Sequence, residues 1–177
     1  MLIGLIVMIG LIGLIVLIGF FCINVNVILL FLNNMKKNFR KGQYLISTDK
    51  ARLDIKVIHG FLSNSYWAKN RTLKAIKISI KNSLCFGLYF KGRQTGFARV
   101  ITDYATFAYL ADVFILEEHR GRGLSKWLME VILNYGEIQN LRRWFLATKD
   151  AHKLYEKFGF TSLKEPDKLM EIFRKDL

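Results

Sequence analysis

The first 32 residues form an apolar run that is interrupted only by glycines and by Asn24 and Asn26. No charged residue precedes Lys36, so every Lys, Arg, Asp and Glu lies from that position onward. A run of this length exceeds the ~20 residues that a helix needs to span a bilayer, which predicts a membrane helix. The basic residues that follow would hold the rest of the chain on the cytoplasmic side, and a membrane partner is expected only if this helix forms.

A second interpretation of the same segment rests on its internal repeat. Leu2–Gly10 recurs as Leu11–Gly19 with a single change, and the period of three residues matches no helical spacing. Tandem identity of this kind resembles translated repetitive DNA, and Met35 would serve as an ordinary cytoplasmic start. Residues 1–34 are therefore either a membrane anchor or an over-extended reading frame, and a basic linker is expected over residues 35–43.

From residue 44 onward the hydrophobic pattern alternates between the two-residue period of strands and the 3.6-residue period of helices. The order of these segments predicts one mixed α/β domain over residues 44–177, with a sheet flanked by helices. Strands are expected at 44–47, 84–90, 95–101, 106–116, 141–148 and 170–173, and helices at 54–62, 72–80, 124–135 and 150–158.

Composition narrows the functional classes. The 177 residues carry a net charge of +13 and only two cysteines, Cys22 and Cys85. A disulfide framework is not expected, and a reducing cytoplasm is the natural compartment. The charge favours polyanionic partners, among which nucleic acid, anionic lipid and a phosphorylated cofactor are all compatible with it. His59, His119 and His152 lack the spacing of metal ligands, so no metal is expected.

The chemically informative segment is residues 113–126, where a strand passes through a glycine turn into a helix. Such a turn directs several backbone N–H groups to one place, and the helix dipole adds positive potential, so a pyrophosphate fits there. Gly121 and Gly123 permit close approach of the backbone. Alone, the pattern is of moderate specificity, because a basic glycine turn is usually only a solvated connection. The charged residues of the turn are Arg120, Arg122 and Lys126.

Two motifs together resemble the GNAT superfamily of N-acetyltransferases. The pyrophosphate signature of that family, Arg/Gln-x-x-Gly-x-Gly/Ala, is matched by Arg120 and Gly123, with Ser125 in the final small position. A second motif, Ala-x-x-Leu-Tyr-x-x-x-Gly-Phe, is matched over residues 151–160. The resemblance covers nearly all of residues 44–177. It implies a mixed, mostly antiparallel sheet flanked by helices, and transfer of acetyl from acetyl-CoA to a primary amine of a small acceptor.

The resemblance also implies roles for individual residues. The strand before the turn would bind pantetheine through its backbone, and the turn would bind the pyrophosphate. Tyr155 would be the general acid that protonates the CoA thiolate, with packing on an apolar helix stripe as the alternative. Thr148 lies where many relatives have an Asn that orients the cofactor. The implied cofactor-binding residues are Val113, Phe114, Ile115, Arg120, Gly121, Arg122, Gly123, Leu124, Ser125, Lys126 and Thr148.

The sequence does not single out one general base. Many relatives place a Glu on the central strand, where this chain has Ala111. Asp112 is a candidate, but strand alternation directs it to the opposite face unless a bulge re-aims it. Its alternative role is that of a buried carboxylate bonded to the backbone or to an arginine. Asp103 and Tyr104 are further candidates on the acceptor side, and a water relay without a dedicated base is equally compatible.

The acceptor is expected beside the first two helices, where Tyr66, Trp67 and Arg71 cluster. Exposed aromatic rings beside an arginine suit a small polar acceptor, including one that bears a carboxylate, although packing of Trp67 under the sheet is the simpler account. Two functional classes other than an enzyme are compatible with parts of the sequence. One is a basic nucleic-acid-binding module, which the spread of the charges and the lack of a binding motif disfavour. The other is a degenerate GNAT fold that binds CoA as a sensor, suggested by Ala111 and Thr148.

Overall fold

A computed structural model describes residues 37–174, and the two interpretations of residues 1–34 lie outside the described residues. Within the described part, no helix is long and apolar enough to cross a membrane. Among residues 37–174, six strands form one sheet in which they lie in chain order. The strands are β1 Asn38–Lys41, β2 Tyr44–Ser47, β3 Leu84–Phe90, β4 Arg93–Thr102, β5 Phe107–Ile115 and β6 Arg143–Phe145.

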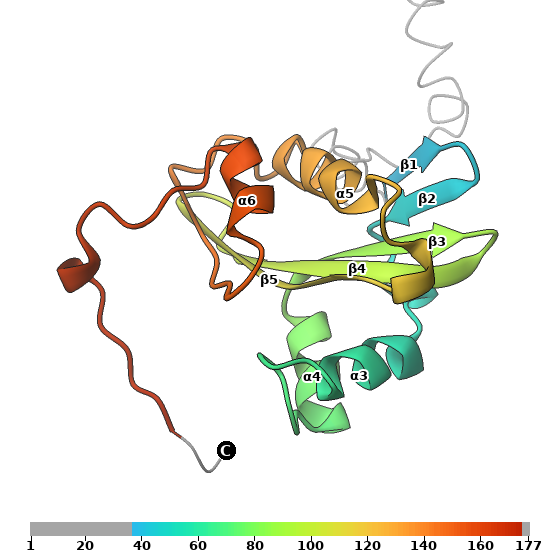
Figure 1. Cartoon of the computed structure of the whole chain (residues 1–177), viewed down its shortest axis with the longest axis horizontal. Coiled ribbons are helices and arrows are strands. Elements are labelled where there is room, and N and C mark those ends of the chain that lie inside the picture. The colour runs from blue at the N-terminus through green and yellow to red at the C-terminus, as the bar shows by residue number, and fades with distance from the viewer. Residues whose placement is uncertain (1–36, 175–177) are drawn as a thin grey trace, which may run out of the picture. The chain divides into compact units, whose positions relative to one another are not determined.

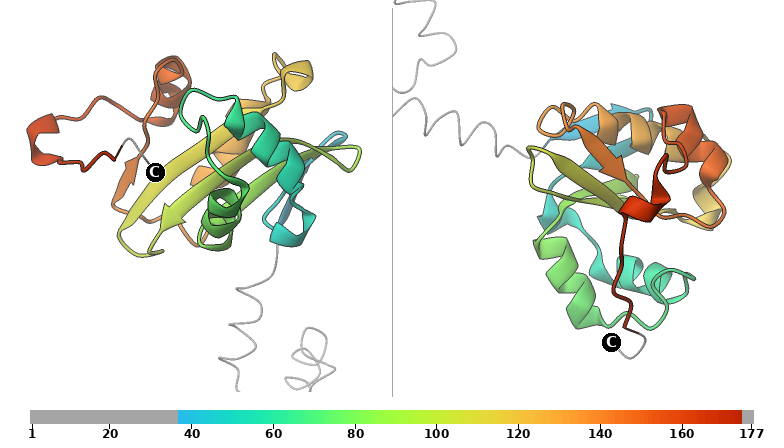
Figure 2. Two further views of the ribbon diagram at one scale, coloured as in Figure 1. Left: turned by 90° about the horizontal axis from the view of Figure 1, so that it is seen from below. Right: turned by 90° about the vertical axis from the view of Figure 1, so that its left-hand side faces the viewer.

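Helices cover both faces of the sheet. Two of them lie on one face and two on the other, as Figure 1 and the views in Figure 2 show. The first pair is α3 Ile55–Ser63 and α4 Leu73–Lys81, and the second is α5 Leu124–Leu133 and α6 His152–Tyr155. This arrangement confirms the predicted mixed sheet flanked by helices. All strand pairs are antiparallel except that of β5 with β6.

Local capping explains where the helices of the first pair begin. The Asp54 carboxylate accepts hydrogen bonds from the backbone N–H groups of Lys56 and Val57 at 2.9 and 3.2 Å. The Thr72 hydroxyl accepts one from the N–H of Ala75 at 3.2 Å. Both caps satisfy donors that a helix start would otherwise leave unpaired, which accounts for the success of the predicted bounds. The residues that these helices bury are Ile58, Leu62, Ile76 and Ile80.

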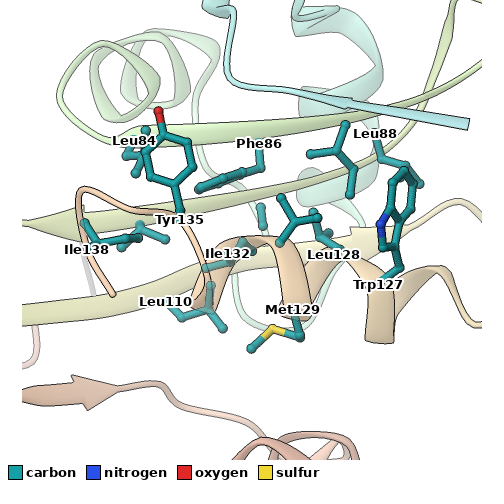
Figure 3. Packing of buried hydrophobic residues seen from close by; sticks show 14 of the residues in the cluster. Leu84, Phe86, Leu88, Leu110, Trp127, Leu128, Met129, Ile132, Tyr135 and Ile138 are labelled. Carbon is teal, nitrogen blue, oxygen red and sulfur yellow. The ribbon is translucent and has the colours of Figure 1, made fainter. Parts of the chain in front are cut away.

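The sheet separates two hydrophobic cores. The larger one lies against α5, where Leu128 and Ile132 are fully buried in the same cluster as Phe86 of the sheet (Figure 3). The smaller one lies against α3 and α4, and there Phe61 stacks on Phe114 with ring centroids 4.0 Å apart. Burial on both faces makes the middle strands rigid supports for any side chain that they carry.

A β-bulge interrupts β5. The pairing with β4 shifts so that Asp112 and Val113 lie opposite the single residue Ala98, and Asp112 has a φ of 53°. Leu110 belongs to the core against α5, whereas Phe114 belongs to the core against α3 and α4. Regular alternation would put residues four positions apart on the same face, so the bulge reverses the faces of the strand. The bulge therefore re-aims Asp112 toward α3 and α4.

The parallel pairing between β5 and β6 is short. It runs from Phe107 opposite Arg143 to Tyr109 opposite Phe145, and β6 ends there. Beyond Tyr109, no described strand pairs with this edge of β5. The two chain segments separate at this point, so the backbone groups of the second half of β5 are open on one side.

Two strand predictions are wrong. Residues 38–41, expected in a basic linker, form β1 and pair with β2 across a turn at Gly42, whose φ is 57°. Residues 170–173, expected as a last strand, form none, and Met170 and Ile172 are 97% and 88% exposed. The segment that contains them extends away from the sheet (Figure 2). Strand identity in both cases depends on a partner edge, which the pattern of a single segment does not contain.

Two further predictions had the right type of element but the wrong length. The strand expected at residues 141–148 is only the three-residue β6. The helix expected at residues 150–158 consists of α6 followed by the 3-10 turn Glu156–Phe158. Gly159 ends it with a φ of 84°, as the glycine signal predicts.

Candidate active site

A pocket of about 320 Å³ lies where β5 separates from the chain that follows β6. Its walls come from β5, from the α3–α4 loop and from the segment that leads into α6. The structure thus brings together side chains that are distant in sequence. The pocket-lining residues that the sequence predicted for the site are Tyr66, Trp67, Arg71, Asp112, Val113, Thr148 and Tyr155. Those that it missed as site residues include Arg99, Tyr109 and Asp150.

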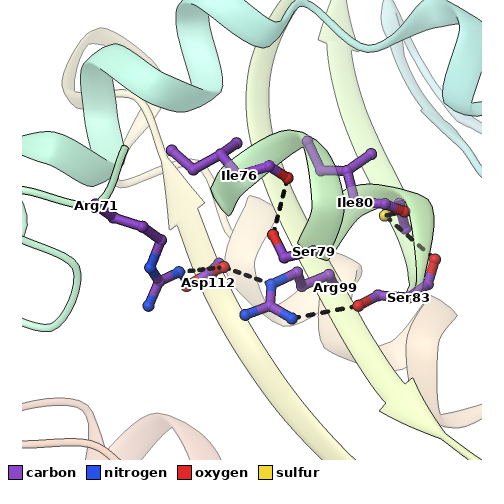
Figure 4. A network of polar contacts seen from close by, with 8 residues as sticks. Arg71, Ile76, Ser79, Ile80, Ser83, Arg99 and Asp112 are labelled. Carbon is purple, nitrogen blue, oxygen red and sulfur yellow. Dashed lines mark hydrogen bonds and ion pairs between the residues drawn. The ribbon is translucent and has the colours of Figure 1, made fainter. Parts of the chain in front are cut away.

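The Asp112 carboxylate is held between two arginines (Figure 4). Arg99 donates from Nε to Asp112 Oδ2 at 2.5 Å, and Arg71 donates from Nη1 to both carboxylate oxygens at 3.0 Å. Arg99 also donates from Nη1 to the Ser83 hydroxyl at 3.2 Å. Only 2% of the Asp112 side chain is exposed, so both oxygens are satisfied inside the protein. This arrangement favours the interpretation of Asp112 as a buried, arginine-bonded carboxylate.

Arg99 was not found from the sequence, although one signal was present. It is a charged residue in an otherwise apolar run, and it is 9% exposed in the structure. A buried arginine needs a partner, and the register of β4 with β5 places Arg99 opposite Ala111, beside Asp112. The pairing could be recognised only once the register of the two strands was known.

The α3–α4 loop forms one wall of the pocket. Tyr66 and Trp67 contact each other edge to face with centroids 5.0 Å apart, and Trp67 is 40% exposed. Trp67 is therefore only partly packed, and its ring contacts Phe61 with centroids 6.3 Å apart. The Tyr66 hydroxyl accepts a hydrogen bond from the N–H of Lys149 at 2.8 Å and donates one to Asp150 at 3.4 Å. These bonds link the loop to the segment that carries Tyr155.

The position of Tyr155 is compatible with both roles that its sequence context allowed, packing and proton donation. Its ring packs at the edge of the larger core and meets Phe160 edge to face at 5.9 Å, while the residue also lines the pocket. Burial raises the pKa of its phenol to about 12, with smaller contributions from Tyr66 and Asp150. The hydroxyl forms no hydrogen bond within residues 37–174. The phenol is thus protonated at neutral pH and has a proton to donate.

The glycine turn precedes α5 and has the backbone that the sequence suggested. Gly121 and Gly123 have φ values of 75° and 73°, and Gly123 is the N-cap of α5 without any side chain capping the helix. A Cβ at either glycine would meet nothing within 4 Å, so the left-handed backbone and not packing requires glycine there. The uncapped first turn of α5 leaves N–H groups for an anion. Arg120 is anchored by a 3.1 Å hydrogen bond from Nε to the carbonyl of Ile115.

Three candidates either lie outside the pocket or already accept hydrogen bonds from the chain. Tyr104 lies in the hairpin between β4 and β5, is 50% exposed and is not among the residues that line the pocket. Asp103 accepts from the Thr106 hydroxyl and from three backbone N–H groups of the hairpin, which holds the pKa of its carboxyl well below the usual range. Thr148 lines the pocket but uses its hydroxyl to accept from the N–H of Ala151 at 3.0 Å.

Comparison with known proteins identifies the family. Residues 81–162 match the family model described as an acetyltransferase (GNAT) domain. A protein of Gibberella zeae that is named as an acetyltransferase is 34% identical, and the match covers 74% of this chain and 86% of that protein. The chain belongs to the GNAT acetyltransferase family. A GNAT-family protein of Xanthomonas campestris pv. campestris, solved as a crystal structure, is 51% identical with a TM-score of 0.73, covering 76% of this chain and 96% of that one.

A more distant GNAT structure shares the fold alone. The acetyltransferase of Elizabethkingia anophelis, whose structure contains acetyl-CoA, is 13% identical with a TM-score of 0.55, covering 76% of this chain and 91% of that one. Membership of the GNAT family confirms the predicted family and the predicted acyltransferase class. The region that matches the family model, residues 81–162, contains strands β3 to β6 of the observed sheet.

Proposed function

We propose that this GNAT protein transfers the acetyl group of acetyl-CoA to the primary amine of a small acceptor. The observation that carries the proposal is the pocket at the separation of β5 from β6. There the protonated phenol of Tyr155 faces the same cavity as the open edge of β5. An acid beside unpaired backbone donors is what acyl transfer from a thioester requires. The volume of about 320 Å³ suits a small acceptor.

The glycine turn and the end of β5 are the proposed cofactor site. The N–H groups of the first turn of α5 would bind the pyrophosphate, with charge from the neighbouring basic side chains. The backbone of Val113–Ile115 would bind the pantetheine, since this stretch of β5 has no strand on its outer edge. At ~3.3 Å per residue, Asp112 and Leu116 are separated by roughly 13 Å. The proposed site is therefore elongated, with the pocket toward one end and the turn toward the other. The residues proposed for the pyrophosphate are Arg120, Gly121, Arg122, Gly123, Leu124, Ser125 and Lys126.

The proposed chemistry uses few groups of the chain. Acetyl-CoA supplies an acetyl thioester. The uncharged amine forms a bond to the acetyl carbon, the carbon–sulfur bond breaks, and Tyr155 gives its proton to the leaving sulfur. Backbone N–H groups on the open edge of β5 stabilise the carbonyl oxygen as it gains negative charge.

The amine is proposed to lose its proton to water. Asp112 is buried and both of its oxygens accept from arginine, so taking up a proton there would break the ion pairs. Ala111 offers no group that could serve instead. Asp112 is thus assigned to positioning Arg71 and Arg99.

Replacing Tyr155 by Phe tests the assignment of the acid. The substitution keeps the ring packing and removes the proton, so kcat should fall by a factor of about 10²–10⁴. The melting temperature and the affinity for acetyl-CoA should stay close to those of the wild type. Tyr109→Phe is the matched control, because Tyr109 lines the same pocket, and it should change kcat little. Release of the CoA thiol is the readout.

The pH profile adds a second check. With its pKa raised to about 12, the wild-type phenol keeps its proton through pH 10, so it should impose no alkaline fall in kcat below that pH. If Tyr155→Phe retained wild-type kcat while Tyr155→Ala lost stability, the ring alone would matter and the catalytic assignment would be withdrawn. Binding of acetyl-CoA without turnover of any amine would favour a CoA-binding sensor instead.

A further inference from the structure

The two arginines that bind Asp112 differ in the donors they leave free. Arg99 uses both Nε and Nη1, and its side chain is only 10% exposed. Arg71 uses Nη1 alone, and 28% of its side chain is exposed. Its other terminal nitrogen points away from Asp112 (Figure 4) and has no partner within residues 37–174. Since a guanidinium has five N–H donors, Arg71 can bind a second anion while it holds Asp112.

Arg71 faces the pocket in which the acetyl transfer is proposed. Arg71, Arg99 and Asp112 together carry one net positive charge at the pocket wall. The exposed carboxylate of Asp150 lines the same pocket and acts electrostatically on Tyr155. The pocket therefore combines a cationic group with a carboxylate near the proposed acid. A small molecule with an anionic group and an amine complements both.

The chain on either side of Arg71, including the helix that follows it, carries charge of the same sign. Between Asp54 and Asp103 the chain contains nine Lys and Arg and no Asp or Glu. Three of these lysines, Lys74, Lys77 and Lys81, are exposed on α4, which covers the same face of the sheet as the Arg71 loop (Figure 2). A positive field on this side attracts anions and repels cations. It thus disfavours acceptors that carry several amines and favours those with an acidic group.

We propose that the acceptor is a small amine that bears a carboxylate, and that Arg71 binds this carboxylate through its free guanidinium donors. Trp67 and Tyr66 form the wall of the pocket beside it. The proposal rests on the proposed acetyl transfer and narrows its acceptor to one chemical class. In this arrangement Arg71 is a specificity residue, while Asp112 fixes the position of its guanidinium.

A comparison of amino acids with their α-carboxamides tests the proposal. The two series differ in the charge of one group, and kcat/KM is measured for each with the full chain and acetyl-CoA. The wild type should prefer the acids. Arg71→Gln should lower kcat/KM for the acids by about 10- to 100-fold, as expected for loss of a charge-assisted pair, and change the value for the amides by less than about threefold. Gln can still donate to Asp112, which helps the fold to persist.

The ratio of kcat/KM for the acids to kcat/KM for the amides makes the test specific to Arg71. Partial unfolding of the variant lowers both values equally, and the intrinsic reactivity of each amine is common to both proteins, so both effects cancel. Lys77→Gln removes a charge from the same face without touching the pocket, and it should leave the ratio near that of the wild type.

The outcomes separate this inference from the function on which it rests. An equal loss for acids and amides in Arg71→Gln would show that Arg71 only supports the fold, and would overturn the proposal. Turnover of neutral or cationic amines, with none for the acids, would contradict a carboxylate on the acceptor but would still support the proposed acetyl transfer. Absence of CoA thiol release with every amine would overturn both.

Discussion

Replacing Asp112 by Asn separates a structural carboxylate from a catalytic one. The substitution keeps the size of the side chain but removes the charge that two guanidinium groups face. Removing one partner of a buried ion pair costs about 3–5 kcal/mol, because the remaining charge stays buried and unpaired. Arg99 is in that position, with its side chain 10% exposed, whereas Arg71 at 28% can be partly hydrated. The lower end of the range, about 3 kcal/mol, is therefore expected.

The loss can be measured as the free energy of unfolding in urea, followed by circular dichroism. For a domain of this size, about 3 kcal/mol corresponds to a fall in melting temperature of roughly 10 °C. Asp150→Asn is the matched control, because Asp150 lines the same pocket but is exposed. It should change the stability by less than about 0.5 kcal/mol.

One result would contradict a structural role for Asp112. If Asp112→Asn had wild-type stability but a kcat lowered by a factor of about 10² or more, Asp112 would act in proton transfer. The buried ion pairs would then not be its main contribution. A loss of stability with kcat per folded molecule nearly unchanged would support the positioning role.

Three further outcomes follow from the structure. Acetyl-CoA should raise the melting temperature of the wild type. Gly123→Asp should abolish this shift, because it places a carboxylate at the proposed phosphate site. Gly92→Asp is the control, since Gly92 is a hairpin glycine with a similar φ of 83°, and it should retain the shift. Tyr89→Phe should leave stability unchanged or raise it by about 1 kcal/mol, since the buried Tyr89 hydroxyl has no partner among the described residues; a clear loss in urea unfolding would contradict this. A protein that starts at Met35 should fold and show the same acetyl-CoA shift, because the sheet is built from residue 38 onward; failure to fold would assign residues 1–34 a structural role.

Much of the fold could be predicted because its signals are local. The starts of α3 and α4 depend on Asp54 and Thr72, which cap N–H groups two or three residues away. The glycine turn depends on the φ values of Gly121 and Gly123 themselves. Helical periodicity likewise acts over a few residues, so the bounds of α5 came close to the expected ones. Strand β1 was missed because its residues are mostly exposed and only the neighbouring edge makes them a strand.

Contiguous motifs were sufficient to predict the family, the order of the elements from β2 to α6 and the position of the proposed phosphate-binding turn. The surroundings of Asp112, by contrast, depend on tertiary contacts. Arg71 lies 41 residues from it in the chain and Arg99 lies 13 residues away, and a bulge sets the face on which the three meet. A bulge is a property of the register between two strands, and a buried charge selects its partners by proximity in space. Neither can be inferred from the spacing of residues along one chain segment.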